Sequence, residues 1–181
     1  MNPTNAGHIE VTVVEHDPGW TEAFEKEAAM VRGILGDDLI NLFHIGSTSV
    51  AGLAAKPVID ILAVVADISR LDGREKAFAG AGYEAMGEFG LPGRRYFRKG
   101  GARRTHQIHA YQYDSVHEIT RHLAFRDYLR ENAGVRAAYE ELKLALAKKF
   151  PHDIGAYCDG KDDFIKRAEA EALRWYWRRY A

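Results

Sequence analysis

The feature that most constrains this sequence is an apolar run at 58–65, VIDILAVV, in which one carboxylate, Asp60, interrupts the aliphatic residues. The run is apolar at odd and even positions alike, which is typical of a strand covered on both faces of its sheet. A second apolar run at 39–45, LINLFHI, is also rich in β-forming residues. Two such strands need helices on both sides, so the sequence predicts a layered fold with a buried sheet.

Helical and strand patterns alternate along the rest of the chain. Ser115 and Glu118 have the S-x-x-E spacing in which the first turn of a helix caps itself. The order predicts an α+β fold with a mixed sheet flanked by helices and a C-terminal helical segment. Residues 1–114 would form the core and 115–181 would pack on it, as a single compact unit. We expect strands at 9–15, 39–45, 58–65, 83–86, 94–98 and 103–113, and helices at 18–35, 68–80, 116–131, 135–149 and 162–179.

The overall charge and cysteine content exclude several classes of function. A formal net charge of −1 and a pI near 6.7 provide no general basic field for long nucleic acid. The single cysteine, Cys158, cannot form an intramolecular disulfide or a cysteine-rich zinc site. No run approaches the ~18 apolar residues of a membrane span, so we expect a cytoplasmic protein without a membrane partner. The aromatic stretch at 175–180 could stack a base, but it is expected to pack on a helix or to form a homodimer face.

The candidate site begins with Asp60. An unpartnered carboxylate in an apolar strand would cost several kcal/mol, so Asp60 must face a cation or hydrogen-bond donors. Gly46-Ser47 ends the preceding strand, where backbone N–H groups and a hydroxyl can approach phosphate oxygens closely. Together these residues predict a phosphate-binding site. The alternatives are a structural Asp60 paired with Lys56 or with backbone donors, and an ordinary turn at Gly46.

Several segments resemble one protein family. The spacing between Gly46-Ser47 and Asp60 resembles the signature of the nucleotidyltransferase superfamily, and the longer segment 44–61, HIGSTSVAGLAAKPVIDI, resembles the GrpB family. Further matching segments lie at 106–111 (HQIHAY), 122–130 (HLAFRDYLR) and 157–164, so the resemblance runs from about residue 9 to residue 170. It implies a nucleotidyltransferase-like fold, and a relation to the domain fused to some dephospho-coenzyme A kinases.

The resemblance also implies roles for individual residues. In active members of the superfamily, a serine at the position of Ser47 helps to hold a triphosphate. Carboxylates at the position of Asp60 and two residues later bind magnesium. Here Leu62 stands at the second position, and the third acidic position falls near His109. A two-metal arrangement therefore lacks ligands.

Other residues could complete a metal site. Gln107 and His109 share one face of the strand at 103–113 by alternation. We predict Asp60 and His109 as catalytic residues, and Asp60, Gln107 and His109 as ligands of a divalent metal, Mg²⁺ or Mn²⁺ with Zn²⁺ as a further alternative. The other interpretation is that the histidines are hydrogen-bonded interior or edge residues.

Cationic residues that could meet phosphate lie in several segments. Guanidinium groups suit phosphate better than a lone ammonium. The alternative for each arginine is a solvated sheet edge, or a structural clamp in the case of Arg126. The predicted substrate-binding residues are Gly46, Ser47, Thr48, Lys56, Arg94, Arg95, Arg104, Arg126 and Lys161.

Three functions are consistent with these residues. The first is a protein that binds a nucleotide or another phosphorylated small molecule, with metal-dependent nucleotidyl or phosphoryl transfer as its chemistry. The second is a non-catalytic nucleotide-binding or coenzyme A-related partner module, which Leu62 favours. The third is a metal-dependent hydrolase that uses the His and Asp residues.

Overall fold

The computed structural model describes residues 10–179 of the chain. Its sheet and helices correspond to most of the elements expected from the sequence. The strands are β1 (Leu39–Ile45), β2 (Ile59–Val65), β3 (Tyr83–Ala85), β4 (Arg94–Lys99) and β5 (His106–Gln112), and the helices are α1 (Gly19–Leu35), α2 (Glu75–Gly80), α3 (Val116–Glu131), α4 (Ala133–Lys149) and α5 (Ile154–Arg179).

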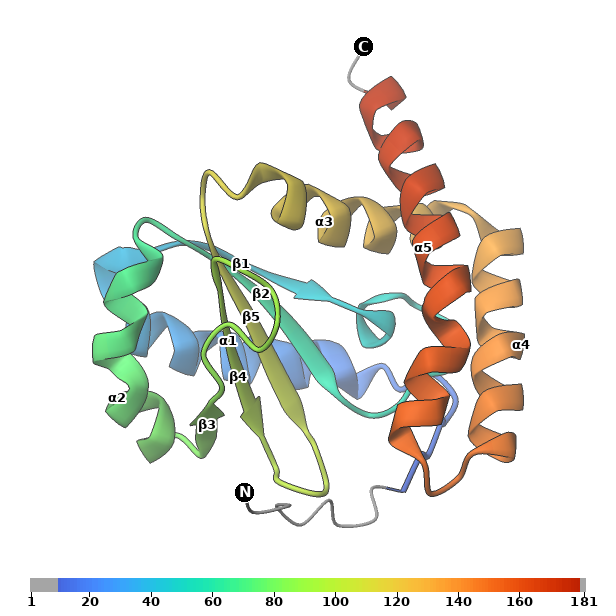
Figure 1. The fold of residues 1–181 in the computed structure, drawn as a ribbon, viewed down its shortest axis with the longest axis horizontal. Coiled ribbons are helices and arrows are strands. Elements are labelled where there is room, and N and C mark those ends of the chain that lie inside the picture. Colours follow the sequence, from blue (N-terminus) through green and yellow to red (C-terminus); the bar gives the residue numbers. More distant parts are fainter. Residues whose placement is uncertain (1–9, 180–181) are drawn as a thin grey trace.

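The five strands form one mixed sheet in the order β1-β2-β5-β4-β3 (Figure 1). Strands β2 and β5 pair in parallel, whereas the other neighbours are antiparallel. The parallel register sets Asp60 opposite Gln107 and Leu62 opposite His109. Because side chains alternate along a strand, all four side chains lie on the same face of the sheet. The sequence prediction of an α+β fold with a mixed sheet is confirmed.

Different helices cover the two faces of this sheet. On one face, α1 buries an apolar stripe that includes Trp20, Phe24 and Leu35 against Ile59 and Ile61 of β2. Asp17 caps the start of α1, because its Oδ1 accepts a hydrogen bond of 2.8 Å from the N–H of Gly19. On the other face, α3 packs over β1 and β2. The apolar run at 58–65 is therefore buried from both sides, as expected.

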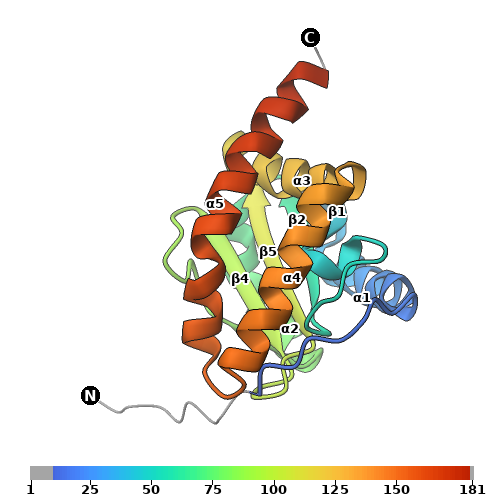
Figure 2. The ribbon, with the colours of Figure 1, turned by 90° about the vertical axis from the view of Figure 1, so that its right-hand side faces the viewer.

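Helices α4 and α5 stand beside one end of the sheet (Figure 2). They contact each other and α3, and an apolar cluster joins all three helices to the loop that follows β1. Figure 1 shows the C-terminal part of α5 extending past α3. This arrangement brings residues of α4 and α5 to the turn between β1 and β2. Within residues 10–179, no helix is long and apolar enough to cross a membrane.

Three of the expected elements differ from the structure. The helix expected at 68–80 is a 3₁₀ helix over Ile68–Arg74 and becomes the α-helix α2 only at Glu75. The strand expected at 9–15 is wrong for residues 10–15, which form only an isolated bridge between Val14 and Ala55, and residue 9 lies outside the described residues. The helix expected to begin at 162 begins at Ile154 instead. Asp153 caps this start, because its Oδ1 accepts a 2.9 Å hydrogen bond from the N–H of Ala156.

Candidate functional site: a lysine-lined cavity

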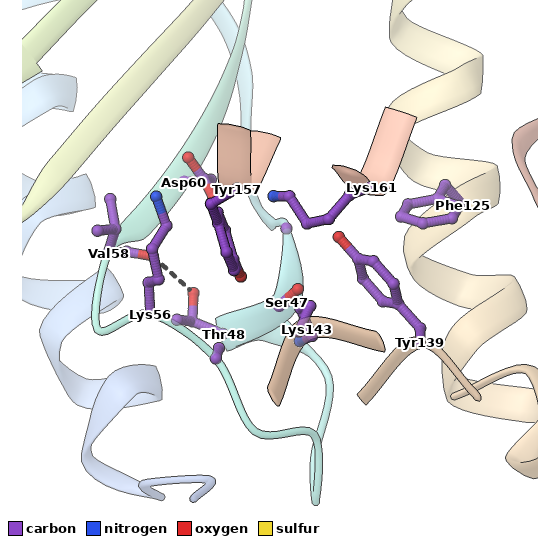
Figure 3. Close-up of a pocket in the computed structure, with 12 residues that line it drawn as sticks. Ser47, Thr48, Lys56, Val58, Asp60, Phe125, Tyr139, Lys143, Tyr157 and Lys161 are labelled. Carbon is purple, nitrogen blue, oxygen red and sulfur yellow. Dashed lines mark hydrogen bonds between the residues drawn. The ribbon is translucent and has the colours of Figure 1, made fainter. Parts of the chain in front are cut away.

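The turn after β1 and the C-terminal helices enclose a cavity of about 140 Å³ (Figure 3). Some of the residues predicted from the sequence to bind substrate or metal line this cavity: Gly46, Ser47, Thr48, Lys56, Asp60 and Lys161. The rest of the wall comes from the loop before β2 and from three helices: Ala55, Val58, Phe125, Tyr139, Lys143 and Tyr157.

Gly46 makes the close approach between the turn and Asp60. Its φ of 70° and ψ of −174° fall in a region that only glycine adopts easily. A Cβ atom built on Gly46 would lie 2.4 Å from Oδ2 of Asp60. Both the backbone conformation and the available space therefore require glycine here. The chain then enters a short 3₁₀ turn at Ser47–Ser49, which presents Ser47 to the cavity.

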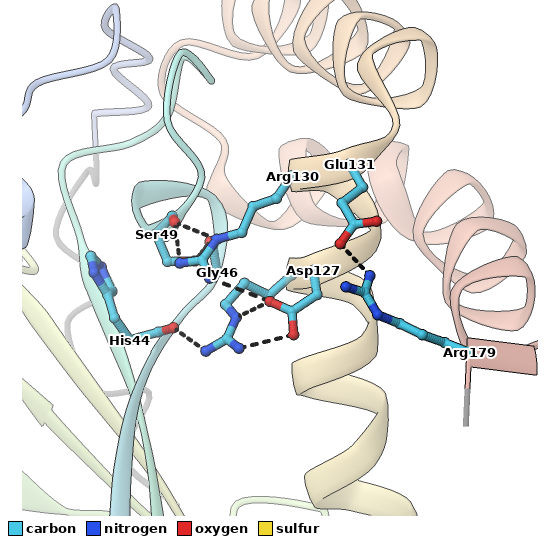
Figure 4. A network of polar contacts seen from close by, with 8 residues as sticks. His44, Gly46, Ser49, Asp127, Arg130, Glu131 and Arg179 are labelled. Atoms are coloured by element: carbon cyan, nitrogen blue, oxygen red, sulfur yellow. Dashed lines mark hydrogen bonds and ion pairs between the residues drawn. The ribbon is translucent and has the colours of Figure 1, made fainter. Parts of the chain in front are cut away.

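Two arginines of α3 hold this turn through its backbone carbonyls (Figure 4). Arg130 donates hydrogen bonds of 2.7 and 3.1 Å to the carbonyl of Ser49. Arg126 donates a bond of 3.2 Å to the carbonyl of His44 and forms a bidentate ion pair with Asp127. Arg126 was predicted as a phosphate contact, but it supports the turn from the α3 side and does not line the cavity.

His44 and Thr48 support the turn from inside. The Thr48 hydroxyl donates a hydrogen bond of 3.2 Å to the carbonyl of Val58 and lies 3.0 Å from Nε2 of His44. Because a hydroxyl carries one proton, His44 must be the donor to Thr48. Burial lowers the pKa of His44 to about 4, although the charge of Asp60 opposes this shift. A neutral His44, stacked on Phe24 with ring centroids 4.8 Å apart, is thus a structural residue.

The cations of the site are lysines. Lys56 and Lys161 lie on either side of the Tyr157 ring, with their Nζ atoms 5.4 and 4.5 Å from its centroid (Figure 3). Lys143 lies deeper, with only 2% of its surface exposed. Its Nζ is 4.6 Å from the centroid of Tyr139 and donates a hydrogen bond to the carbonyl of Ala54.

The electrostatic balance of the cavity is positive, because three lysines face one carboxylate across its walls. Burial lowers the pKa of Lys143 to about 7, and the charge of Lys161 acts in the same direction. Burial also lowers the pKa of Lys161, with Lys56 contributing and Asp60 opposing. Both pKa values are lowered because the ammonium groups are poorly solvated and lie close to other lysines. An anion in the cavity would relieve this cost.

The predicted metal ligands fit a metal ion only in part. Oδ1 of Asp60 lies 3.7 Å from Nε2 of His109, and Gln107 is opposite Asp60 on β5. Over residues 10–179, no group of three or more His, Cys, Asp and Glu side chains is placed to hold a metal ion. Leu62 is fully buried where a second carboxylate would be needed. The donors of this site do not fit a two-metal centre.

The remaining predicted arginines lie outside the cavity wall. Arg94 is buried and donates to the carbonyls of Glu88 and Phe89, so it holds the loop before β4. Arg95 forms a bidentate ion pair with Asp72, and its Nε is 2.6 Å from Oδ1. These two side chains already have protein partners. Arg104 has one hydrogen bond, of 3.4 Å, to the hydroxyl of Tyr96, and its Nε is buried without a partner.

The sequence analysis missed two residues of α4, Tyr139 and Lys143. A lysine in a charged amphipathic helix is normally assigned to solvent. The signal that could have found Lys143 is its position four residues after Tyr139 and three before Leu146, on the same buried face of the helix. Burial raises the pKa of Tyr139, while a hydrogen bond with Ser47 opposes the rise, so Tyr139 also contacts the turn.

The mixed sheet, with a Gly-Ser turn after one strand and an acid on the next, defines a nucleotidyltransferase-like α+β protein. The Cid1 poly(U) polymerase, solved with MgGTP bound, superimposes with a TM-score of 0.51 and 16% identity. The match covers 75% of this chain and 44% of that chain. At this level of identity the similarity shows the fold alone.

The family follows from closer matches. The family model described as GrpB protein matches residues 10–171, and the chain belongs to the GrpB family. The crystal structure of the conserved protein GrpB from Enterococcus faecalis has a TM-score of 0.89 and 51% identity, covering 92% of this chain and 99% of that one. This confirms the resemblance expected from the sequence.

Two longer relatives contain a matching region. The UPF0157 protein YqkA of Bacillus subtilis is 41% identical over 91% of this chain, which spans about half (48%) of YqkA. A dephospho-CoA kinase of Mycobacterium leprae is 25% identical over 97% of this chain and 49% of its own length. The region shared with this chain is thus also found inside larger proteins.

Proposed function

We propose that this protein binds the phosphate end of a nucleotide or a related phosphorylated small molecule in the cavity between the Gly46 turn and α5. The observation that carries the proposal is the set of three lysines, Lys56, Lys143 and Lys161, that converge on one cavity with a single carboxylate. Lys56 and Lys161 supply the positive charge, whereas Lys143, with a pKa of about 7, is partly neutral at neutral pH. Burying ammonium ions in this way is costly unless an anion completes the site.

The parts of the site have distinct roles in this proposal. Lys56 and Lys161 supply charge at the cavity wall, and Tyr157 keeps their ammonium groups apart. Ser47 and the backbone N–H groups of its turn provide hydrogen-bond donors, as glycine-serine turns do in other phosphate sites. Asp60 would not contact the phosphate, because the two negative charges repel each other. Its carboxylate would instead accept hydrogen bonds from a sugar or acceptor hydroxyl.

The fold supports a nucleotide as ligand, since nucleotidyltransferases share it, but the charge arrangement differs from a two-metal enzyme. The proposal therefore places phosphate recognition on lysines. Binding without turnover, as in a partner module, agrees with the buried Leu62. Nucleotidyl or phosphoryl transfer remains the chemistry to test, and incubation with nucleoside triphosphates and Mg²⁺ or Mn²⁺ would release pyrophosphate if it occurs.

A thermal-shift panel tests the proposal. Pyrophosphate, nucleoside triphosphates and sugar phosphates are each compared with sulfate at equal ionic strength. A ligand at 100 times its dissociation constant stabilises the fold by about 2.7 kcal/mol, so a phosphorylated ligand should raise the melting temperature by several degrees. Ser47→Ala should reduce the shift. A panel in which no phosphorylated compound exceeds sulfate would refute the proposal.

A further inference from the structure

Lys143 differs from the other lysines of the protein in its surroundings. It lies on α4, it is 2% exposed, and it is one of the residues that line the cavity. Its Nζ contacts two uncharged groups, the ring of Tyr139 and the carbonyl oxygen of Ala54. Glu140, whose charge favours the ammonium form, uses its Oε2 to accept a 2.8 Å hydrogen bond from the N–H of Ala54. An ammonium ion at this position is poorly stabilised.

The protonation state of Lys143 follows from these contacts. Burial and the charge of Lys161 lower its pKa to about 7, and Glu140 opposes the shift. At neutral pH, a substantial fraction of Lys143 is therefore neutral and carries a free lone pair. An exposed lysine with a pKa near 10.4 has a far smaller neutral fraction. Desolvated lysines beside a second cation are the usual amine nucleophiles of proteins.

The neighbours of Lys143 determine which electrophile can reach it. Lys56 and Lys161 line the same cavity, and Ser47 lies on the turn opposite α4. A compound held there by its phosphate would place its other end within reach of Nζ. The cavity of about 140 Å³ restricts this compound to a few heavy atoms beyond the phosphate.

We propose that Lys143 forms an imine with a small phosphorylated aldehyde or ketone that is held in the cavity by its phosphate group. The neutral Nζ attacks the carbonyl carbon, and a proton passes from nitrogen to oxygen to give a carbinolamine. Loss of water then forms the C=N bond, so amine and carbonyl yield imine and water without oxidation or reduction. The inference rests on the proposed phosphate site, because the phosphate directs the carbonyl to this one lysine.

Reductive trapping tests the inference. The full-length protein is incubated with glycolaldehyde phosphate, reduced with borohydride and mapped by peptide mass spectrometry. Glycolaldehyde without phosphate is the matched probe. We expect the Lys143 peptide to be labelled at least about tenfold faster than peptides with exposed lysines, given its larger neutral fraction. Pyrophosphate should protect Lys143, and glycolaldehyde should label it much more slowly.

Variants and competing outcomes make the test specific. Lys143→Met should abolish the fast labelling, whereas Lys148→Met, at an exposed position of the same helix, should not change it. The wild-type peptide map is decisive even if Lys143→Met folds poorly. Pyrophosphate binding with an unlabelled Lys143 would overturn the imine while the proposed function stands. Equal labelling by both aldehydes, without protection by pyrophosphate, would overturn both.

Discussion

Replacing Gly46 by alanine tests the geometry on which the site depends. A non-glycine residue at φ 70° and ψ −174° costs of order 1–3 kcal/mol in backbone strain. The new Cβ would also lie 2.4 Å from Oδ2 of Asp60, so the Asp60 side chain must rotate away. Together we expect Gly46→Ala to lower the free energy of unfolding by about 3 kcal/mol, a large part of a typical stability.

The two contributions can be separated with a double-mutant cycle. In an Asp60→Ala background the clash with the carboxylate disappears, while the backbone strain and the 3.1 Å contact with Cβ of residue 60 stay. Gly46→Ala should then cost about 2 kcal/mol, which leaves a coupling energy near 1 kcal/mol between the two positions. Urea denaturation followed by circular dichroism measures each value from the midpoint and slope of the transition.

A matched control and a binding readout complete this experiment. Gly33 lies in the last turn of α1 with nothing within 4 Å of an added Cβ, so Gly33→Ala should stabilise the protein, by at most about 0.5–1 kcal/mol. Pyrophosphate binding should weaken in Gly46→Ala and stay unchanged in Gly33→Ala. Wild-type stability of Gly46→Ala, or strictly additive effects with Asp60→Ala, would refute the close approach between this turn and β2.

Three further predictions concern other parts of the molecule. His44 has a pKa of about 4 in the fold and 6.5 when unfolded, so only the unfolded chain binds its proton in that interval, and stability should fall as the pH drops from 6.5 to 4. In His44→Gln, acid titration of the melting temperature should show a shallower slope over this range, and an unchanged slope would contradict the assignment. Because Asp60 and His109 alone do not complete a metal site, EDTA dialysis should leave pyrophosphate binding unchanged, whereas loss of binding that Mn²⁺ restores would establish the predicted metal. Gly160→Ala should destabilise by about 1–3 kcal/mol, since its Cβ would lie 2.5 Å from Cδ2 of Leu146, and a urea midpoint equal to wild type would exclude this close packing of α4 and α5.

The apolar periodicity of the sequence predicted the sheet well. The run at 58–65 is apolar at odd and even positions, and the structure buries β2 between α1 and α3. The run at 39–45 forms the edge strand β1, whose first half is partly exposed: Ile40 is 55% exposed. Alternation placed Gln107 and His109 on one face of their strand, and the parallel register puts Asp60 on that same face of the sheet. These features depend on patterns of neighbouring residues, so they can be predicted from one sequence.

Long-range packing explains where the sequence predictions were wrong. Gly155 and Gly160 lower helix propensity, so α5 was expected to begin later than Ile154. The structure uses Gly160 where Leu146 of α4 packs closely against α5. Ser115 and Glu118 were expected to cap α3, but Ser115 makes no side-chain cap bond and Glu118 binds Arg121 instead. A competing ion pair cannot be read from local spacing.

The cationic residues of the site were also predicted only in part, because their positions depend on long-range packing. The sequence offered more arginines than lysines as phosphate contacts, because a guanidinium matches phosphate geometry. Arg94 and Arg95 instead hold loops through nearby carbonyls and Asp72. Lys143 was absent from the prediction, because only the tertiary fold brings α4 beside the Gly46 turn. Neighbouring groups already bind two of the predicted arginines, whereas a helix distant in sequence contributes a lysine that was not predicted.

Calorimetric titration of inorganic pyrophosphate, in EDTA, tests the central claim most directly. Lys161→Met removes one cavity cation, and Lys166→Met removes an exposed lysine from the same helix. Wild type and Lys166→Met should bind with the same dissociation constant. Lys161→Met should bind at least about tenfold more weakly, the loss expected for a charged hydrogen bond. No binding by wild type, or equal binding by Lys161→Met, would contradict a phosphate site built from these lysines.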